Sequence, residues 1–161
     1  MSKTFFISDH HFLHNNIIKY CNRPFSSCKE MDDFMIAKWN SVVADEDTVI
    51  HGGDFALGNM PLARRIFEQL KGNKIIVLGN HDRKKRLQQM GFTDIRNFWY
   101  ENGILVVHIP WDLPIDYQKQ YEECKIALYG HTHNKPVLNP EYIKIRSMCV
   151  ELNNYTPFTL E

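Results

Sequence analysis

A unit made of an apolar strand, a polar turn and a helix-compatible segment occurs three times in the first half of this sequence. The strands are expected at residues 4–8, 48–50 and 75–78, and each leads into a turn rich in Asp, Asn, Gly and His. Strands that alternate with helices form parallel sheets, and the carboxyl ends of those strands share one edge. Open α/β sheets bind ligands at such an edge. The pattern therefore predicts an α/β protein with one polar, ligand-binding edge.

The intervening helices are predicted from apolar residues that recur at three- and four-residue intervals. A short helix is expected at residues 15–20, and a longer one begins at Ser26 or Ser27. A third begins at Asn59 with Pro61 in its first turn, and a fourth covers residues 83–90. The second helix carries an apolar stripe expected to be core, formed by Met31, Phe34, Met35, Trp39, Val42 and Val43.

The second half has a different pattern. Strands at residues 96–100 and 104–108 flank Glu101-Asn102-Gly103, and Asn-Gly is a strong hairpin signal. Further strands are expected at residues 125–129, 142–146 and 148–152. Residues 110–123 indicate a loop with a short helix, which could cover a site. No linker or repeat interrupts the chain, so residues 1–161 are expected to form a single domain.

The composition excludes several classes of protein. Nineteen basic and nineteen acidic residues cancel, so no global field attracts nucleic acid or an anionic membrane. Apolar runs are short and the amino terminus lacks signal-peptide features, so we expect a cytoplasmic protein with no membrane association. The four cysteines are too widely spaced for a paired-thiolate zinc site and are expected to be reduced and structural. The sequence gives no indication of oligomeric state.

Polar residues with metal-ligand chemistry follow five of the expected strands. Each has an ordinary alternative when taken alone: Asp9 could cap a helix, Asp54 could close a turn, and His108 could be a hydrogen-bonded core residue. Together, carboxylate, imidazole and amide groups suit divalent manganese, iron, zinc, nickel or cobalt. The residues are Asp9, His11, Asp54, Asn80, His81, His108, His131 and His133.

Two ions would need at least six ligands with one shared, and a carboxylate can bridge them. Asp54 is the predicted bridge. Ions roughly 3.5–4 Å apart can hold a water as hydroxide and neutralise a phosphoryl group during in-line attack. Such a site would hydrolyse a phosphoester.

The ordered motifs resemble the signature of the calcineurin-like metallophosphoesterase superfamily. They are Asp9-His10-His11, Gly53-Asp54, Gly79-Asn80-His81-Asp82, His108 and Gly130-His131-Thr132-His133. Residues 9–14 with Asn16-Ile17-Ile18, and Val150-Glu151-Leu152 with Tyr155 and Pro157, are similar to a small bacterial and phage branch. The resemblance covers nearly the whole chain. It implies a sandwich of two mixed β-sheets flanked by α-helices.

The resemblance also implies a role for each motif residue. Asp9, His11, Asp54 and His133 would surround one metal, and Asp54, Asn80, His108 and His131 the other. His81 matches the histidine that contacts the phosphoryl group or protonates the leaving oxygen. Asp82 is expected to orient the His81 ring and fix its tautomer.

For four residues near these motifs the predicted role is less specific. His10 could serve packing or substrate contact, and His14 could line the pocket or cap a helix. His51 is expected to be buried behind the ligands. Arg83 is the residue of the basic run 83–86 that we expect to contact substrate, although such a run is usually a solvated face.

The expected function is therefore hydrolysis of a small phosphomonoester or phosphodiester, such as a nucleotide, with a diester preferred by analogy with small family members. An alternative is an inert scaffold that keeps the fold and binds a protein partner. Such a scaffold is expected to lose ligands or the His81 equivalent, and this chain keeps them. A zinc-stabilised nucleic-acid module ranks last, because paired cysteines and a net basic charge are missing.

Overall fold

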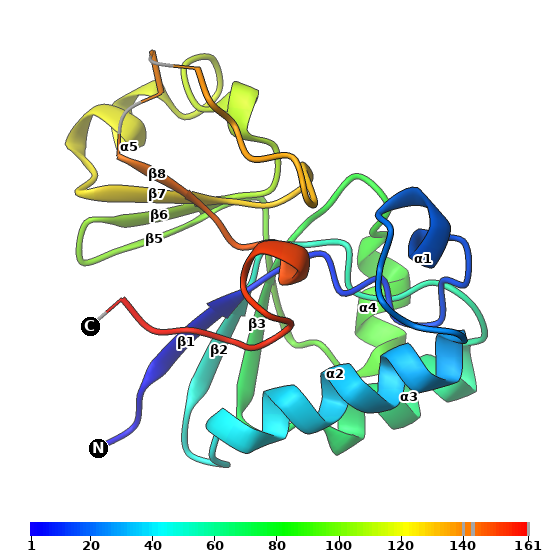
Figure 1. Cartoon of the computed structure of the whole chain (residues 1–161). Coiled ribbons are helices and arrows are strands. Elements are labelled where there is room, and N and C mark those ends of the chain that lie inside the picture. The colour runs from blue at the N-terminus through cyan, green and yellow to red at the C-terminus, as the bar shows by residue number, and fades with distance from the viewer. Residues whose placement is uncertain (140, 143, 161) are drawn as a thin grey trace.

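The first sheet is formed by the amino-terminal half of the chain. In the computed structural model, which describes residues 1–139, 141–142 and 144–160, its strands are β1 (Thr4–Ile7), β2 (Thr48–His51), β3 (Asn73–Val77) and β4 (Asp94–Arg96). They lie side by side in sequence order and every pair is parallel (Figure 1). The three repeated units therefore form one parallel sheet, as predicted.

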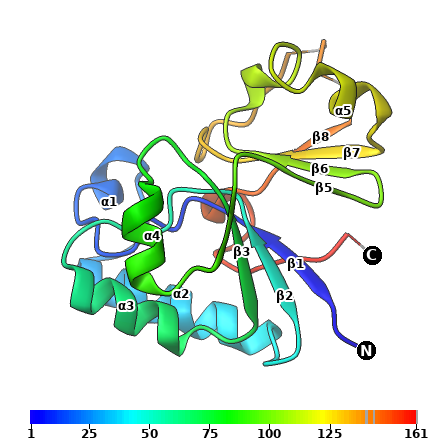
Figure 2. The same ribbon diagram turned by 180° about the vertical axis from the view of Figure 1, so that it is seen from behind.

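Four helices lie on one side of this sheet (Figures 1 and 2). They are α1 (Ile17–Tyr20), α2 (Cys28–Val42), α3 (Met60–Gln69) and α4 (Lys84–Met90). The Ser27 side chain caps α2 by accepting from the Glu30 N–H, and Asn59 caps α3 by accepting from the Leu62 N–H. Both helix starts confirm the positions predicted from the sequence.

The second sheet contains β5 (Trp99–Glu101), β6 (Ile104–Val107), β7 (Ile126–Tyr129) and β8 (Ile145–Ser147). The β5–β6 pair is the expected antiparallel hairpin, and the other pairs are parallel. A 3-10 turn at Pro110–Asp112 and helix α5 (Gln118–Glu123) lie on the outer side of this sheet (Figure 2). The two four-stranded sheets with flanking helices confirm the predicted α/β sandwich. The named strands of the first sheet are all parallel, and its antiparallel contact is the single bridge between Phe6 and Phe158.

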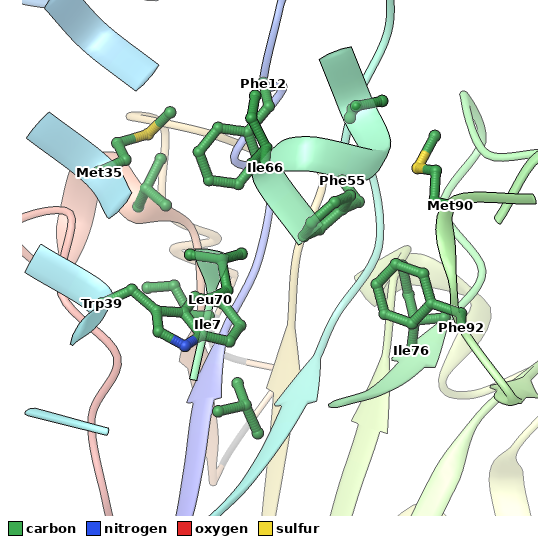
Figure 3. Packing of buried hydrophobic residues seen from close by; sticks show 14 of the residues in the cluster. Ile7, Phe12, Met35, Trp39, Phe55, Ile66, Leu70, Ile76, Met90 and Phe92 are labelled. Atoms are coloured by element: carbon green, nitrogen blue, oxygen red, sulfur yellow. The ribbon is translucent and has the colours of Figure 1, made fainter. Parts of the chain in front are cut away.

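Three layers of apolar side chains hold these elements together. Alternate residues of a strand point to opposite faces, so Phe5 and Ile7 pack against the helices whereas Phe6 packs between the sheets. Figure 3 shows the helix layer, in which Trp39 of α2 and Leu70 lie over Ile7. A third cluster lies between the second sheet and the 110–123 segment. The two sheets are thus fixed against each other by a shared buried layer.

Three sequence expectations need correction. Arg96 ends β4 of the first sheet, and the hairpin strand begins only at Trp99. Residues 148–152 are not a strand, because they form a bridge at Cys149 followed by a 3-10 turn. Phe34 and Val42 are 39 % and 40 % exposed, so the core stripe of α2 is narrower than predicted. The expected strand at 142–146 begins in the described residues at Ile145, and residue 143 lies outside them.

The carboxyl ends of both sheets meet at the centre of the molecule. Ser8, just after β1, forms a parallel bridge with Cys149, and its N–H donates to the Met148 carbonyl at 2.9 Å. The loops that follow β1, β2, β3, β6 and β7 are therefore brought together. No helix in the described ranges has the length and apolar character needed to cross a membrane.

Candidate metal centre

The predicted ligands lie in the loops at this shared edge, and five of them have strained backbone. Left-handed φ angles between 49° and 68° occur at Asp9, His11, Asp54, His131 and His133. This region costs non-glycine residues roughly 1 kcal/mol or more each, so it persists only where surrounding structure enforces it. Such strain is typical of functional sites.

Two glycines allow the loops to approach closely. A Cβ atom on Gly79 would lie 2.1 Å from Asp54 Oδ1, and one on Gly53 would lie 2.6 Å from the Gly79 nitrogen. Gly53 also has a φ of 102°, which favours glycine. The turns after β2 and β3 can therefore touch only because both positions lack side chains.

Asp54 lies between two histidines from different loops. Its Oδ2 is 3.4 Å from His11 Nε2 and 3.4 Å from His108 Nε2. Its Oδ1 accepts the His81 N–H at 2.9 Å, which fixes the carboxylate plane. Burial alone would raise the pKa of Asp54, but the adjacent His108 and His11 imidazoles outweigh it and hold that pKa well below its usual range. A buried carboxylate in this position can serve both halves of a paired site.

Asp9 is fully buried beside the same histidines. Its Oδ2 accepts from Ser8 Oγ at 2.5 Å and from the His131 N–H at 3.0 Å. Its Oδ1 is 4.0 Å from His11 Nε2 and 3.9 Å from His133 Nε2. Two groups of candidate metal ligands result, namely Asp9, His11 and His133, and Asp9, Asp54 and His108.

The donor atoms fit a bound cation. His108 Nδ1 is 2.7 Å from the Gly52 carbonyl and must donate to it, so a neutral ring carries a lone pair on Nε2. That Nε2 is 2.9 Å from Asn80 Oδ1, which is also 3.0 Å from His131 Nδ1. The buried His11 Nε2 has no hydrogen-bond partner among the residues that the structure describes. Acceptors that face one another need a cation or a proton between them, and the nitrogen and oxygen donors suit a divalent metal.

Comparison with known proteins gives the family. The model of the calcineurin-like phosphoesterase superfamily domain matches residues 3–147. The chain belongs to this superfamily. It is 36 % identical to the uncharacterized protein MJ1445 of Methanocaldococcus jannaschii, with 100 % of this chain and 89 % of that protein covered. It is 25 % identical to the gene 66 protein of Mycobacterium phage L5, with 86 % and 81 % covered.

A solved structure has the same fold over nearly its whole length. The protein of unknown function AQ665 from Aquifex aeolicus superposes with a TM-score of 0.79 at 30 % identity. The alignment covers 98 % of this chain and 95 % of that one. The family model thus confirms the superfamily predicted from the motifs, and this structure confirms the fold.

In this calcineurin-like domain, His133 is held from behind by a buried ion pair. His133 Nδ1 lies 2.9 Å from Glu151 Oε1, which also accepts from Arg23 Nη2 at 2.8 Å. Burial alone would lower the pKa of His133, but contacts with Cys21, Glu151 and Asp9 raise it to about 10. Glu151 fixes the ring so that Nε2 faces Asp9, as expected of an outer partner of a ligand.

Arg23 also connects this pair to the first motif. Its guanidinium donates to the backbone carbonyls of Asp9 and His10, both at 2.7 Å. Arg23 is not among the site residues predicted from the sequence. A buried arginine that clamps a motif's backbone has no local sequence signal, because Arg23 and Glu151 are 128 residues apart.

Asp82 has a role different from the predicted one. Its Oδ2 accepts the N–H groups of Asp54 at 2.7 Å and Gly79 at 2.9 Å, and its Oδ1 accepts that of Phe55 at 3.3 Å. These bonds tie the turns after β2 and β3 together, and within the described residues no hydrogen bond joins the Asp82 carboxylate to the His81 ring. His81 is exposed, and its ring lies edge-on to His11 with centroids 5.5 Å apart.

The less specific residues fall into two groups. His10 and His51 are both fully buried, and their rings share a 2.9 Å contact between Nδ1 and Nε2. This places His10 in packing and His51 behind the ligands. His14 lies at the pocket, with Nδ1 3.3 Å from His11 Nδ1. Arg83 is exposed and donates to the Asn80 and Asp82 carbonyls, which places it at the rim.

A cavity of about 300 Å³ opens directly beside the centre. Its wall includes His11, His81 and His133 together with residues of α1 and of the loop after β7. Two other hollows of comparable volume, one between α2 and α3 and one near the amino terminus, include none of the candidate ligands. On the other side of the centre, the half-exposed Trp111 lies edge-on to His131 at 5.1 Å.

Proposed function

We propose that this protein is a two-metal-dependent phosphoesterase that prefers a small phosphodiester. The observation that carries the proposal is the position of Asp54 Oδ2, 3.4 Å from the Nε2 atoms of both His11 and His108. His11 follows a strand of the first sheet and His108 follows one of the second, and they belong to different candidate ligand groups that have Asp9 in common. A carboxylate between them supports a paired site with one shared ligand.

The ligands divide into two sets with this carboxylate in common. Asp9, His11 and His133 would hold one ion with Asp54, and the other would be held by Asp54, Asn80, His108 and His131. Manganese, iron, zinc, nickel and cobalt all suit this donor set. When bound, the ions would activate a water and neutralise charge on the phosphoryl group.

The chain's own residues would orient substrate and supply a proton. His81 is anchored through its backbone N–H to Asp54 Oδ1, and its exposed ring reaches the cavity. From there it can protonate the leaving oxygen as a general acid. Asn80 and Arg83 would contact the phosphoryl oxygens from the same turn.

A diester is preferred because the cavity beside the centre can take a second organic group. Metal-stripped protein, resupplied separately with manganese, nickel, zinc or magnesium, should hydrolyse bis-nitrophenyl phosphate faster than nitrophenyl phosphate. Metal content has to be verified in each sample. No cleavage of either ester by metal-loaded protein would refute the proposal.

The inert scaffold is the second candidate. It would keep the ligands without turnover and would bind a protein partner. The complete ligand set and the exposed His81 ring favour the enzyme, because a scaffold needs neither. A cytoplasmic location remains a prediction from the sequence.

A further inference from the structure

We infer that the cavity beside the metal centre is the subsite for the nucleoside arm of the substrate, with Tyr20 as the stacking surface for its base. The inference rests on the proposed function and names its substrate class. The cavity of about 300 Å³ runs from His81 and His133 to the end of α1. A phosphodiester held at the centre therefore has one organic arm inside it.

Tyr20 forms the outer wall with an unusually exposed ring. It is 72 % exposed at the last position of α1, and its ring lies edge-on to His14 with centroids 6.2 Å apart. An exposed aromatic ring beside a cavity can serve as a stacking partner, because its face is available to a planar ligand. Nucleobases stack on tyrosine whatever their identity.

The inner wall supplies apolar surface and hydrogen-bond donors. Ile17 lines the cavity beneath Tyr20. If His11 Nε2 holds an ion, its Nδ1 carries the hydrogen and donates to His14 Nδ1 at 3.3 Å. His14 then presents an Nε2–H donor, and the cavity residue Lys135 adds an exposed ammonium that has no ion-pair partner in the described part of the chain.

An aromatic ring together with hydrogen-bond donors suits a nucleoside better than an alkyl or simple aryl arm. A planar base would stack on Tyr20 while its carbonyl and ring-nitrogen acceptors, or the sugar hydroxyls, meet His14 and Lys135. A simple aryl arm would leave both donors unused, and an alkyl arm would leave the aromatic surface unused as well. The cavity's chemistry therefore points to a nucleotide-type diester.

Binding can be tested without turnover. Phosphonate analogues of AMP, ribose 5-phosphate and benzyl phosphate, each with methylene in place of the ester oxygen, are titrated calorimetrically into manganese-loaded protein. The AMP analogue should bind roughly tenfold more tightly than the ribose analogue. Tyr20→Ala should remove most of that ratio and Tyr20→Phe should keep it. Tyr100→Ala, at an exposed tyrosine of β5, is the matched control and should leave the ratio unchanged.

Equal binding of the AMP and ribose analogues would overturn the inference. Equal binding of the AMP and benzyl analogues would also overturn it, because the site would then take any aromatic ring. A ratio that survives Tyr20→Ala would contradict the stacking role.

Turnover separates this inference from the proposed function. Thymidine 5′-nitrophenyl phosphate and methyl nitrophenyl phosphate share a leaving group and differ only in the other arm. The nucleoside ester should have the higher kcat/KM, and Tyr20→Ala should lower that value by a larger factor than the value for the methyl ester. Equal kcat/KM values would overturn the subsite but not the phosphoesterase. A binding preference without hydrolysis of either ester would support the subsite and refute the phosphoesterase.

Discussion

The two sheets contribute different chemistry to the candidate centre. The first sheet supplies its oxygen donors, Asp9, Asp54 and Asn80, together with His11. The second sheet supplies only imidazoles, from His108, His131 and His133. The carboxylates of the first sheet are at most 3 % exposed, whereas His131 and His133 are partly open to solvent.

The side chains that the two sheets contribute, the two halves of the centre, are also held in place by different contacts. The carboxylates accept backbone N–H groups, for example from His131 to Asp9 and from His81 to Asp54. The His131 ring, by contrast, contacts the Asn80 side chain and lies edge-on to Trp111 and His108. The oxygen-donor half is thus preorganised by backbone hydrogen bonds, and the imidazole half completes the centre. Removal of a ligand from the first half should therefore reduce metal affinity more than removal of a ligand from the second half.

Asp54→Asn should have the largest effect. It removes the buried charge between His11 and His108, so affinity for both ions should fall by more than the roughly 10–100-fold typical of outer partners. His131→Ala should retain one ion. Metal content after dialysis, measured by mass spectrometry, checks both variants.

Asp33→Asn is the control for this experiment, because Asp33 is an exposed carboxylate paired with Lys29. It should leave metal content unchanged. Equal loss of metal in Asp54→Asn and His131→Ala would contradict the difference between the two halves.

His81→Ala should separate metal binding from turnover. The His81 backbone N–H holds Asp54 and survives the substitution, whereas the ring that would protonate the leaving oxygen is removed. We expect both ions to remain and kcat to fall by roughly a hundredfold to ten-thousandfold. Unchanged kcat with verified metal content would rule out the proton-donor role.

Glu151→Gln tests whether Glu151 holds His133 of the second half in place. Glutamine keeps an acceptor for Arg23 but loses the negative charge that orients His133. Affinity for one ion should fall roughly 10–100-fold, and the metal-free protein should also be less stable, because a buried guanidinium loses its counter-charge. Metal titration and denaturant unfolding measure the two effects separately.

Glu68→Gln, at an exposed i,i+4 pair with Arg64, is the matched control and should change neither quantity. Reduced stability without a change in metal affinity would assign Glu151 a purely structural role.

Local sequence pattern was enough to predict the parallel first half and the gathering of the candidate ligands at one edge of the sheet. The strands, the caps at Ser27 and Asn59 and the polar turns all lie within a few residues of their signals. The ordered motifs then gave the superfamily, because five separate turns matched it together. Each of these features depends on the residues of one short segment.

Features that depend on distant contacts could not be predicted. The sequence did not predict the hydrogen bonds of the Asp82 side chain. Its three partners are backbone N–H groups in turns that come together only in the folded chain. The clamp of Arg23 on the first motif needs Glu151 from the other end of the chain. Residues 148–152 look like a strand by composition, yet Val150 enters the helix-side core and the backbone turns.

Asp32→Asn should have the smallest effect, on stability and not on metal. Asp32 of α2 accepts the Leu13 N–H, at 3.2 Å through Oδ2, and so supports the loop of the first motif. Burial raises the pKa of Asp32 to about 6, although the Leu13 hydrogen bond opposes this. An unfolded aspartate titrates near pH 3.9, so between roughly pH 4 and 6 the folded state retains a proton that the unfolded state has lost.

The free energy of unfolding of metal-free protein should therefore decrease by up to about 2 kcal/mol as pH rises through this window. In Asp32→Asn that decrease should be absent, whereas the neighbouring exposed Asp33→Asn should behave as wild type. Parallel pH profiles for Asp32→Asn and wild type in urea unfolding would show that the Asp32 carboxyl titrates normally in the folded protein.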